Sequence, residues 1–201
     1  KRFRPMLTLL AAQLGAGVND DVVKAAVAVE LVHLASLYHD DVMDEAPRRR
    51  GAESANTRWT NTIAILTGDF LFARSSGVLA DLGPEAVRIQ AQTFERLVSG
   101  QINETVGPMH GADPVAHHLQ VLADKTGVLI ATSCRYGAMF SGCSEDVIEA
   151  LRVYGEAIGV AFQIADDILD IASPAEVSGK TPGTDLREGV MTLPMLLVQA
   201  A

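Results

Sequence analysis

Hydrophobic residues recur at the three-to-four-residue spacing of helices along nearly the whole chain, and almost no stretch alternates as a strand would. Pro5 and Pro84 are typical first residues of helices, and Asn19 or Asp20 can cap a further one. Residues 173–183 are rich in Gly, Pro and Ser and predict a loop. The expected helices cover residues 5–15, 21–45, 58–82, 84–107, 114–123, 126–141, 145–171 and 192–201. The pattern therefore predicts an all-α protein.

The length and charge of the chain narrow its class. With 201 residues it can bury a sizeable core, and we expect residues 1–201 to form a single domain. The chain begins and ends inside apparent motifs or helices, so we expect that domain to be incomplete at both ends. A net charge of -9 argues against a nucleic-acid partner, because phosphate backbones are bound by an excess of basic residues. The two cysteines, Cys134 and Cys143, fit reduced thiols and have no metal-binding spacing.

No stretch reads as a signal peptide or a membrane span. Among the most apolar stretches, residues 25–37 are interrupted by Glu30 and His33. We therefore expect a cytoplasmic protein with no transmembrane segment.

Two of the long predicted helices each finish in an acidic cluster. The members are Asp40, Asp41 and Asp44 in the first acidic cluster and Asp166, Asp167 and Asp170 in the second acidic cluster. At about 100° per residue, His33 shares one helix face with Asp40 and Asp44, within an arc of about 40°. Gln163 and the three residues of the second acidic cluster likewise fall within one arc of about 100°. Both helices are otherwise apolar, so these carboxylates project from core-forming helices, where like charges repel.

Hard divalent cations are the natural partners of such clusters, because neither cluster contains a Lys or Arg. Ligand sets made only of oxygen favour Mg²⁺, which typically takes one or two carboxylates, several waters and substrate phosphates. A single DDxxD motif is often only an exposed acidic helix end. Two copies, each ending an apolar helix, predict a site for metal ions and a diphosphate.

Three runs of basic residues lie around the two acidic clusters and could bind phosphate oxygens. KRFR opens the chain, RRR follows the first acidic cluster, and Lys125 precedes Thr126. Arg grips phosphate oxygens with a fork of donors and Lys as a point charge. A basic run alone is more often a solvated surface, so phosphate binding is inferred from the three runs together and from their order around the acidic clusters.

The motifs resemble, in order, those of the trans-isoprenyl diphosphate synthase (polyprenyl synthetase) family. They are KRFRP, ELVHLASLYHDDVMDEAPRRRG, GDFLFARS, DKTG, FQIADDILD and GKTPGTDLREGVMTLP, and they run through nearly the whole chain. The resemblance implies an isoprenoid-synthase-type helical bundle around a central cavity, three Mg²⁺ ions per active site and a homodimer. It implies a prenyltransferase that joins an allylic diphosphate to isopentenyl diphosphate and gives a longer trans-polyprenyl diphosphate.

The resemblance also assigns roles residue by residue. The residues counted as catalytic are Asp40, Asp41, Asp44, Lys125, Asp166 and Asp167, and both acidic clusters, with Asp170, would bind the metal. The allylic diphosphate would be held by Arg49, Lys125, Thr126, Gln163 and Lys180. The diphosphate of isopentenyl diphosphate would be held by Lys1, Arg4, His33 and Arg50.

The length of the product is a separate expectation. Ala35 and Ser36 lie one turn before Asp40 and are small, whereas family members with short products often carry an aromatic residue there. The growing hydrocarbon should run between apolar helices beneath the first acidic cluster. The two small residues therefore favour a product of C20 or longer.

Three other functions fit part of the sequence. A class I terpene cyclase shares one DDxxD but lacks the basic pocket for a second diphosphate. A phosphohydrolase of the HD type would use His39 and Asp40 and leave the second acidic cluster unexplained. A non-catalytic subunit of a heteromeric prenyl diphosphate synthase is the main alternative, and it should have lost one acidic cluster or the basic anchors, which this chain retains.

Overall fold

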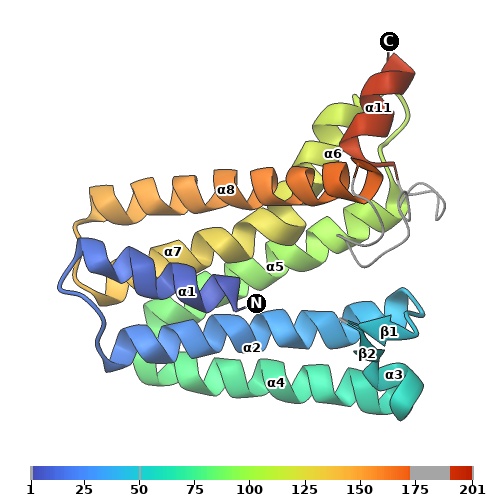
Figure 1. Cartoon of the computed structure of the whole chain (residues 1–201). Coiled ribbons are helices and arrows are strands. Elements are labelled where there is room, and N and C mark those ends of the chain that lie inside the picture. The colour runs from blue at the N-terminus through green and yellow to red at the C-terminus, as the bar shows by residue number, and fades with distance from the viewer. Residues whose placement is uncertain (1, 50, 173–190, 201) are drawn as a thin grey trace. The chain divides into compact units, whose positions relative to one another are not determined.

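The computed structural model of the chain describes residues 2–49, 51–172 and 191–200. Apart from one short hairpin, the secondary structure of this described part is helical, which confirms the all-α class (Figure 1). The predicted loop at 173–183 and the predicted site residues Lys1, Arg50 and Lys180 lie outside the described residues.

Two of the described elements are not ordinary α-helices or strands: η1 is a 3-10 turn and η2 is a π-helical turn. In chain order they are α1 Phe3–Ala11, η1 Ala12–Leu14, α2 Asp20–Met43, β1 Arg48–Arg49, β2 Ala52–Glu53, α3 Ala55–Arg58, α4 Asn61–Leu82, α5 Pro84–Val106, α6 Pro114–Leu122, η2 Ala123–Gly127, α7 Val128–Phe140, α8 Glu145–Ala172 and α11 Leu193–Ala200. Their contacts divide the chain into two compact units. The first unit is Lys1–Ala91 with Thr132–Leu151, and the second unit is Gln92–Ala131 with Arg152–Ala201.

Several helix ends follow the chemistry of their sequence. The Asn19 side chain accepts a hydrogen bond from the N–H of Val22 (2.9 Å) and so caps α2, as predicted. Gly83 ends α4 with a φ of 103°, a conformation that costs glycine little, and Pro84 then opens α5. Both predicted boundaries are confirmed.

The segment between α2 and α4 differs from the prediction. The helix expected from residue 58 begins only at Asn61, because the Thr60 side chain caps it by accepting from the N–H of Ile63 (3.2 Å). Before it the chain forms the antiparallel hairpin β1–β2, with Arg48 opposite Glu53, and then the short helix α3. Strands of two residues are too short to show an alternating pattern, so periodicity did not indicate them.

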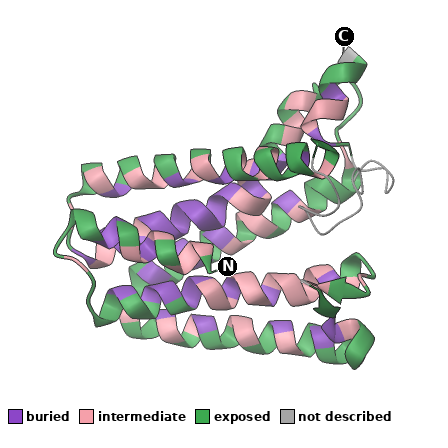
Figure 2. Ribbon diagram, viewed as in Figure 1, coloured by how far each residue is buried: buried purple, intermediate pink, exposed green. Residues whose placement is uncertain are grey.

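In the first unit, α2 packs along α4 and beside α1 (Figure 1). The buried stripe of α2 consists of small and β-branched residues, visible as purple patches in Figure 2. Gly68 brings α4 close: a Cβ added there would lie 2.3 Å from His39 Nε2 and 3.1 Å from the carbonyl oxygen of Ala35. This packing fixes the end of α2 that carries the first acidic cluster.

In the second unit, the turn η2 is held between α5 and α8 by glycines. A Cβ added at Gly100 of α5 would lie 2.8 Å from the backbone nitrogen of Lys125. A Cβ added at Gly159 of α8 would lie 2.6 Å from the Cα of Gly127. Backbone therefore meets backbone on both sides of η2, which leaves the turn little freedom to shift.

Two helices, α2 and α4, are long and apolar enough to cross a membrane by length and composition alone. Core helices of soluble proteins pass the same test, and these two pack against each other in the first unit. They are weak evidence for a membrane span, so the absence of a transmembrane segment stays a prediction.

Candidate functional site

The first acidic cluster lies at the C-terminal end of α2, where the sequence predicts a helix end. The helix stops at Met43, and the backbone N–H of Asp44 donates to the carbonyl oxygen of Asp40 (2.8 Å). The last carbonyl groups of a helix carry partial negative charge. Three carboxylates at this end therefore add to an already negative region, which favours a bound cation.

The three carboxylates of the first acidic cluster do not share one face of α2. Asp40 and Asp44 are about 40° apart, whereas Asp41 is about 100° from Asp40. Asp41 is buried, at 4% exposure, and its Oδ1 accepts from the Nε of Arg49 (2.5 Å). Its backbone carbonyl accepts from the Nδ2 of Asn56 (3.1 Å). Asp41 is thus held by the protein, while Asp40 and Asp44 share a different face.

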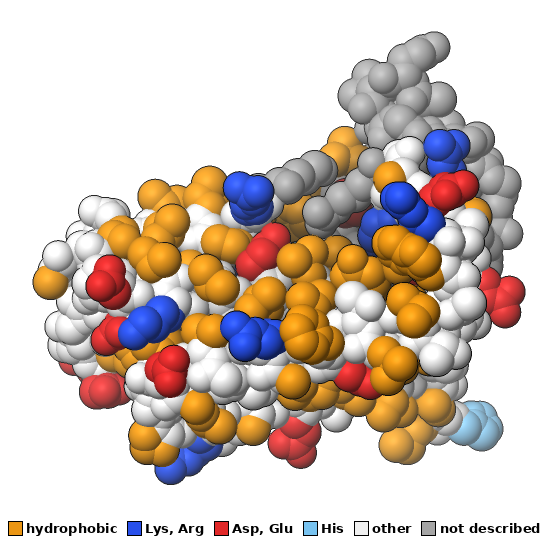
Figure 3. Space-filling model, turned by 90° about the horizontal axis from the view of Figure 1, so that it is seen from below, with side chains coloured by type: hydrophobic (Ala, Val, Ile, Leu, Met, Phe, Trp, Pro, Cys, Tyr) orange, Lys and Arg blue, Asp and Glu red, His pale blue; other side chains and the backbone are white. Residues whose placement is uncertain are grey.

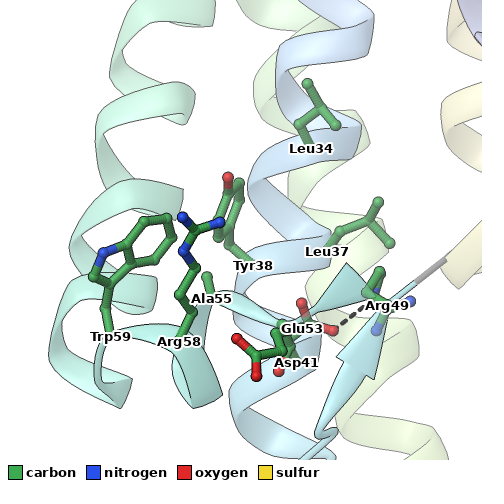
Figure 4. Close-up of a pocket in the computed structure, with 10 residues that line it drawn as sticks. Leu34, Leu37, Tyr38, Asp41, Arg49, Glu53, Ala55, Arg58 and Trp59 are labelled. Atoms are coloured by element: carbon green, nitrogen blue, oxygen red, sulfur yellow. Dashed lines mark hydrogen bonds and ion pairs between the residues drawn. The ribbon is translucent and has the colours of Figure 1, made fainter. Parts of the chain in front are cut away.

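The hairpin places Arg49 against α2 beside a pocket of about 280 Å³ in the first unit (Figure 4). Asp41 and Arg49 meet at one side of this pocket, and Tyr38, Arg58 and Trp59 lie at another (Figure 4). The lining residues are Leu34, Leu37, Tyr38, Asp41, Arg49, Glu53, Ser54, Ala55, Arg58 and Trp59. Two predicted site residues, one acidic and one basic, therefore neutralise each other at its edge.

The predicted anchors for isopentenyl diphosphate are described only in part. His33 is half-buried on the face of α2 that carries Asp40, and Arg4 is half-buried in α1. The other two anchors lie outside the described residues. Ser36 follows His33 by one turn, and its hydroxyl donates to the carbonyl oxygen of His33 (2.9 Å). Ala35 is buried.

The second acidic cluster lies near the C-terminal end of α8. Asp167 is buried, at 5% exposure, and its Oδ1 accepts from the Nε2 of Gln163 (3.2 Å). Its Oδ2 has no hydrogen-bond donor, and the Nε2 of His118 lies 3.6 Å away. A buried carboxylate oxygen without a donor is costly unless something positive compensates it. Asp167 therefore fits a cation, as the sequence predicts.

Among the described residues, no group of three or more His, Cys, Asp and Glu side chains is arranged to hold a metal ion. The donors at the two acidic clusters are nevertheless all carboxylate oxygens, which suit Mg²⁺ and which it uses one or two at a time. The residues present fit Mg²⁺ whose remaining ligands are water and phosphate oxygens.

The predicted diphosphate-binding residues Lys125 and Thr126 lie in the π-helical turn η2, which joins α6 to α7. Such turns are rare and are frequent at functional sites. The Nζ of Lys125 pairs with the Oε2 of Glu104 in α5 (2.5 Å). The hydroxyl of Thr126 donates to the Oε1 of Gln163 (3.4 Å). The second unit thus links Thr126 to Asp167 of the second acidic cluster through Gln163, and Lys125 lies beside Thr126 in the turn.

Sequence reasoning missed Glu104 and His118. Glu104 precedes Lys125 by 21 residues, and His118 precedes Asp167 by 49, so no short-range spacing joins either pair. Neither residue belongs to a motif quoted above. Only the packing of α5 and α6 near η2 and α8 reveals them.

The buried thiol of Cys134 is a poor nucleophile. Burial raises the pKa of this thiol to about 11, so the thiol stays protonated near neutral pH. Cys143 is half-buried, and both cysteines are free, as predicted. Covalent catalysis through Cys134 is therefore disfavoured.

Comparison with known proteins agrees with these observations. A sequence model of the family described as Polyprenyl synthetase matches residues 1–200. Nonaprenyl diphosphate synthase of Mycobacterium tuberculosis is 55% identical over 197 residues, which are 98% of this chain and 59% of that protein.

Solved structures show the same fold. The crystal structure of geranylgeranyl pyrophosphate synthase from Corynebacterium glutamicum, complexed with calcium and isoprenyl diphosphate, matches with a TM-score of 0.88 and 51% identity. Heptaprenyl diphosphate synthase from Staphylococcus aureus matches with a TM-score of 0.92 and 33% identity. Each match covers 100% of this chain, and 60% and 64% of the respective structures. The predicted isoprenoid-synthase-type helical fold is confirmed, and the chain spans about 60% of the length of these relatives.

Proposed function

This chain belongs to the polyprenyl synthetase family, and we propose that it acts as a prenyltransferase that condenses an allylic diphosphate with isopentenyl diphosphate. The product is a longer trans-polyprenyl diphosphate. The observation that carries the proposal is the pair of long helices, α2 and α8, that each bear a DDxxD cluster near their C-terminal ends. The proposal requires both clusters to bind one allylic diphosphate.

Mg²⁺ is the proposed cofactor, with three ions per active site. It would be held by the two acidic clusters, and when bound it would act as a Lewis acid that stabilises negative charge on the departing diphosphate. Asp40, Asp44 and Asp167 are the best placed ligands. The first two share a face of α2, and Asp167 offers a buried oxygen that lacks a donor. Asp41 would bind the metal only after release from Arg49.

The basic residues would hold the two substrates in reacting position. Lys125 and Thr126 would present an ammonium and a hydroxyl from one turn to the allylic diphosphate, with Arg49 as a further cation. His33 and Arg4 would hold the diphosphate of isopentenyl diphosphate. Because His33 and Asp40 share one face of α2, that helix would place the second substrate beside the first.

The chemical step follows from this arrangement. The allylic C–O bond breaks, and both of its electrons leave with the diphosphate, which Lys125 helps to stabilise. The double bond of isopentenyl diphosphate then supplies the electron pair of a new C–C bond to the allylic carbon. A proton is lost from the resulting cation, and the departing diphosphate is the proposed acceptor. No side-chain nucleophile is needed.

Incubation of the purified protein with isopentenyl diphosphate, a series of allylic primers and Mg²⁺ tests the proposal. We expect primer-dependent consumption of isopentenyl diphosphate and longer products in chromatography. Consumption of the allylic diphosphate without isopentenyl diphosphate would indicate a cyclase instead. Turnover that appears only after a second protein is added would support the non-catalytic subunit.

The product is proposed to be C20 or longer, and Ser36 offers the sharper test of this. Ala35 is buried near Gly68, so a larger side chain there would overpack the contact between α2 and α4 and cost about 1–3 kcal/mol. Ser36 is half-buried and lies one turn before Asp40 on the same side of α2. Ser36→Phe is expected to shorten the product by at least one isoprene unit, measured by product sizing. Ser36→Ala is the control, and an unchanged product in Ser36→Phe would refute the assignment.

We also propose that the chain forms a homodimer in the cytoplasm. Four large apolar side chains of α4 are exposed: Ile63, Ile65, Leu66 and Phe70. The Phe70 side chain is 63% exposed. The space-filling view from the side of α4 shows many apolar side chains at the surface (Figure 3). Exposed apolar patches of this kind commonly mark protein interfaces. A second copy of the chain is the partner that the family suggests.

A further inference from the structure

A network of charged side chains surrounds Arg96 in the second unit. Its Nε donates to the Oδ1 of Asp124 (2.8 Å), and its Nη2 donates to the Oε1 of Glu156 (2.7 Å). The other oxygen of Asp124 accepts from the Nε2 of Gln120 (2.8 Å). The other oxygen of Glu156 accepts from the Nη1 of Arg152 (2.8 Å). One guanidinium therefore ties α5 to both η2 and α8.

Arginine suits this place better than any other side chain. Asp124 is buried, so leaving its charge without a partner would be strongly unfavourable. Burial alone would lower the pKa of Arg96, but its hydrogen bonds to Glu156 and Asp124 outweigh that effect and raise the pKa. The guanidinium thus stays charged at any working pH. A lysine would carry the charge but lacks the planar fork that reaches two carboxylates at once.

The network acts on the turn that carries Lys125. Asp124 is the residue immediately before Lys125, and both of its carboxylate oxygens are hydrogen-bonded. The same turn touches Gly100 on α5, and a Cβ added at Gly127 would lie 3.2 Å from the carbonyl oxygen of Glu156 on α8. The two partners of Arg96 therefore lie on the two elements that meet here, Asp124 on η2 and Glu156 on α8. A change at Arg96 would remove the hydrogen bonds that link η2 to α8 through its guanidinium.

We infer that Arg96 is a positioning residue, which holds the turn η2 so that Lys125 and Thr126 are presented together to the diphosphate of the substrate. Arg96 itself pairs with carboxylates and acts through the turn. The inference rests on the proposed function, because it assumes that Lys125 binds diphosphate. It adds to that function the residue that fixes the geometry of the binding turn.

A binding experiment with inorganic pyrophosphate tests this. Affinity is measured by calorimetry in the presence of Mg²⁺ for the parent protein, Arg96→Lys and Arg152→Lys. Arg152→Lys is the matched control, because Arg152 pairs with the same Glu156 from within α8. We expect Arg96→Lys to weaken binding by about tenfold or more and Arg152→Lys by about twofold or less. Thermal unfolding by circular dichroism reports whether each variant is folded.

A double-mutant cycle separates positioning from a general loss of structure. If Arg96 acts through Lys125, then Arg96→Lys should weaken binding much less in a Lys125→Ala background than in the parent protein. Equal weakening in both backgrounds would overturn the inference and leave the proposed role of Lys125 standing. Unchanged pyrophosphate affinity in Lys125→Ala alone would overturn that proposed role and the inference with it. Should Arg96→Lys not fold, Asp124→Asn enters the same cycle with the same expected result.

Discussion

Replacing Asp167 with alanine is expected to lower turnover by about a thousandfold or more, which corresponds to about 4 kcal/mol of transition-state stabilisation. Asp167 is buried in the second acidic cluster, and its Oδ2 has no hydrogen-bond donor, with the Nε2 of His118 3.6 Å away. A buried carboxylate oxygen without a hydrogen bond is costly, and a buried polar atom of this kind is explained by a functional role such as metal binding. Asp40→Ala, in the first acidic cluster, is expected to have an effect of similar size.

Stability measurements distinguish this loss from misfolding. Removing the buried Asp167 carboxylate relieves a desolvation cost and loses one hydrogen bond, from Gln163, so the Tm of Asp167→Ala should lie within a few degrees of the parent or above it. Each helix supplies its own control at its other end. Asp21→Ala in α2 and Asp146→Ala in α8 remove acids from the first turns, cost about 0.5 kcal/mol each through the helix dipole, and should leave turnover unchanged. Near-normal turnover in purified Asp167→Ala and Asp40→Ala would contradict the assigned roles.

Helix boundaries could be predicted from the sequence because they depend on the residues at the boundary itself. The boundary at Gly83 and Pro84 needs only a glycine with positive φ followed by a first-turn proline, and both are visible in the sequence. The hairpin at 48–53 is different. Its strands pair two residues each, and their geometry depends on α2 ending just before them. The turn η2 was likewise not predicted, because a π-helical turn has the same residue composition as the α-helix it interrupts.

The site was predictable as a list of residues and much less so as an arrangement. Helical periodicity places Asp40 and Asp44 on one face of α2 and sets Asp41 apart, but it does not show that Asp41 pairs with Arg49. That pair forms because the hairpin folds Arg49 back onto the helix. Lys125 and Glu104 meet only through the packing of α5 against η2. Ion pairs between residues far apart in the sequence cannot be predicted from motifs, because they depend on how the helices pack.

These ion pairs have a consequence for binding. Arg49 and Lys125, both predicted to bind the allylic diphosphate, are each paired with a carboxylate of the chain. A diphosphate bound as proposed would therefore exchange protein carboxylates for phosphate oxygens at both cations. Exchange of this kind costs little in free energy, because the cations are never left without a partner. On this proposal, Asp41 would become free to bind a cation only when a diphosphate displaces it from Arg49.

Divalent cations and pyrophosphate are accordingly expected to bind cooperatively, and removal of the metal is expected to abolish turnover. Among the described residues no three His, Cys, Asp or Glu side chains are arranged to hold a metal ion, and Mg²⁺ or Mn²⁺ alone is expected to bind weakly. Pyrophosphate would supply further oxygens and would release Asp41, so metal affinity should rise by about a hundredfold, or about 2.7 kcal/mol. By linkage, the metal should raise pyrophosphate affinity by the same factor.

Electron paramagnetic resonance of free Mn²⁺ measures this coupling directly and needs no turnover. Titrations with and without pyrophosphate give the two metal affinities, and calorimetry with and without metal gives the reciprocal pair. Arg49→Ala is the informative variant: it removes the partner of Asp41, so metal alone should bind more tightly than in the parent, and the gain from pyrophosphate should shrink. Metal affinity that is the same with and without pyrophosphate would contradict the coupling. It would also show that the two acidic clusters bind their cations independently of any diphosphate.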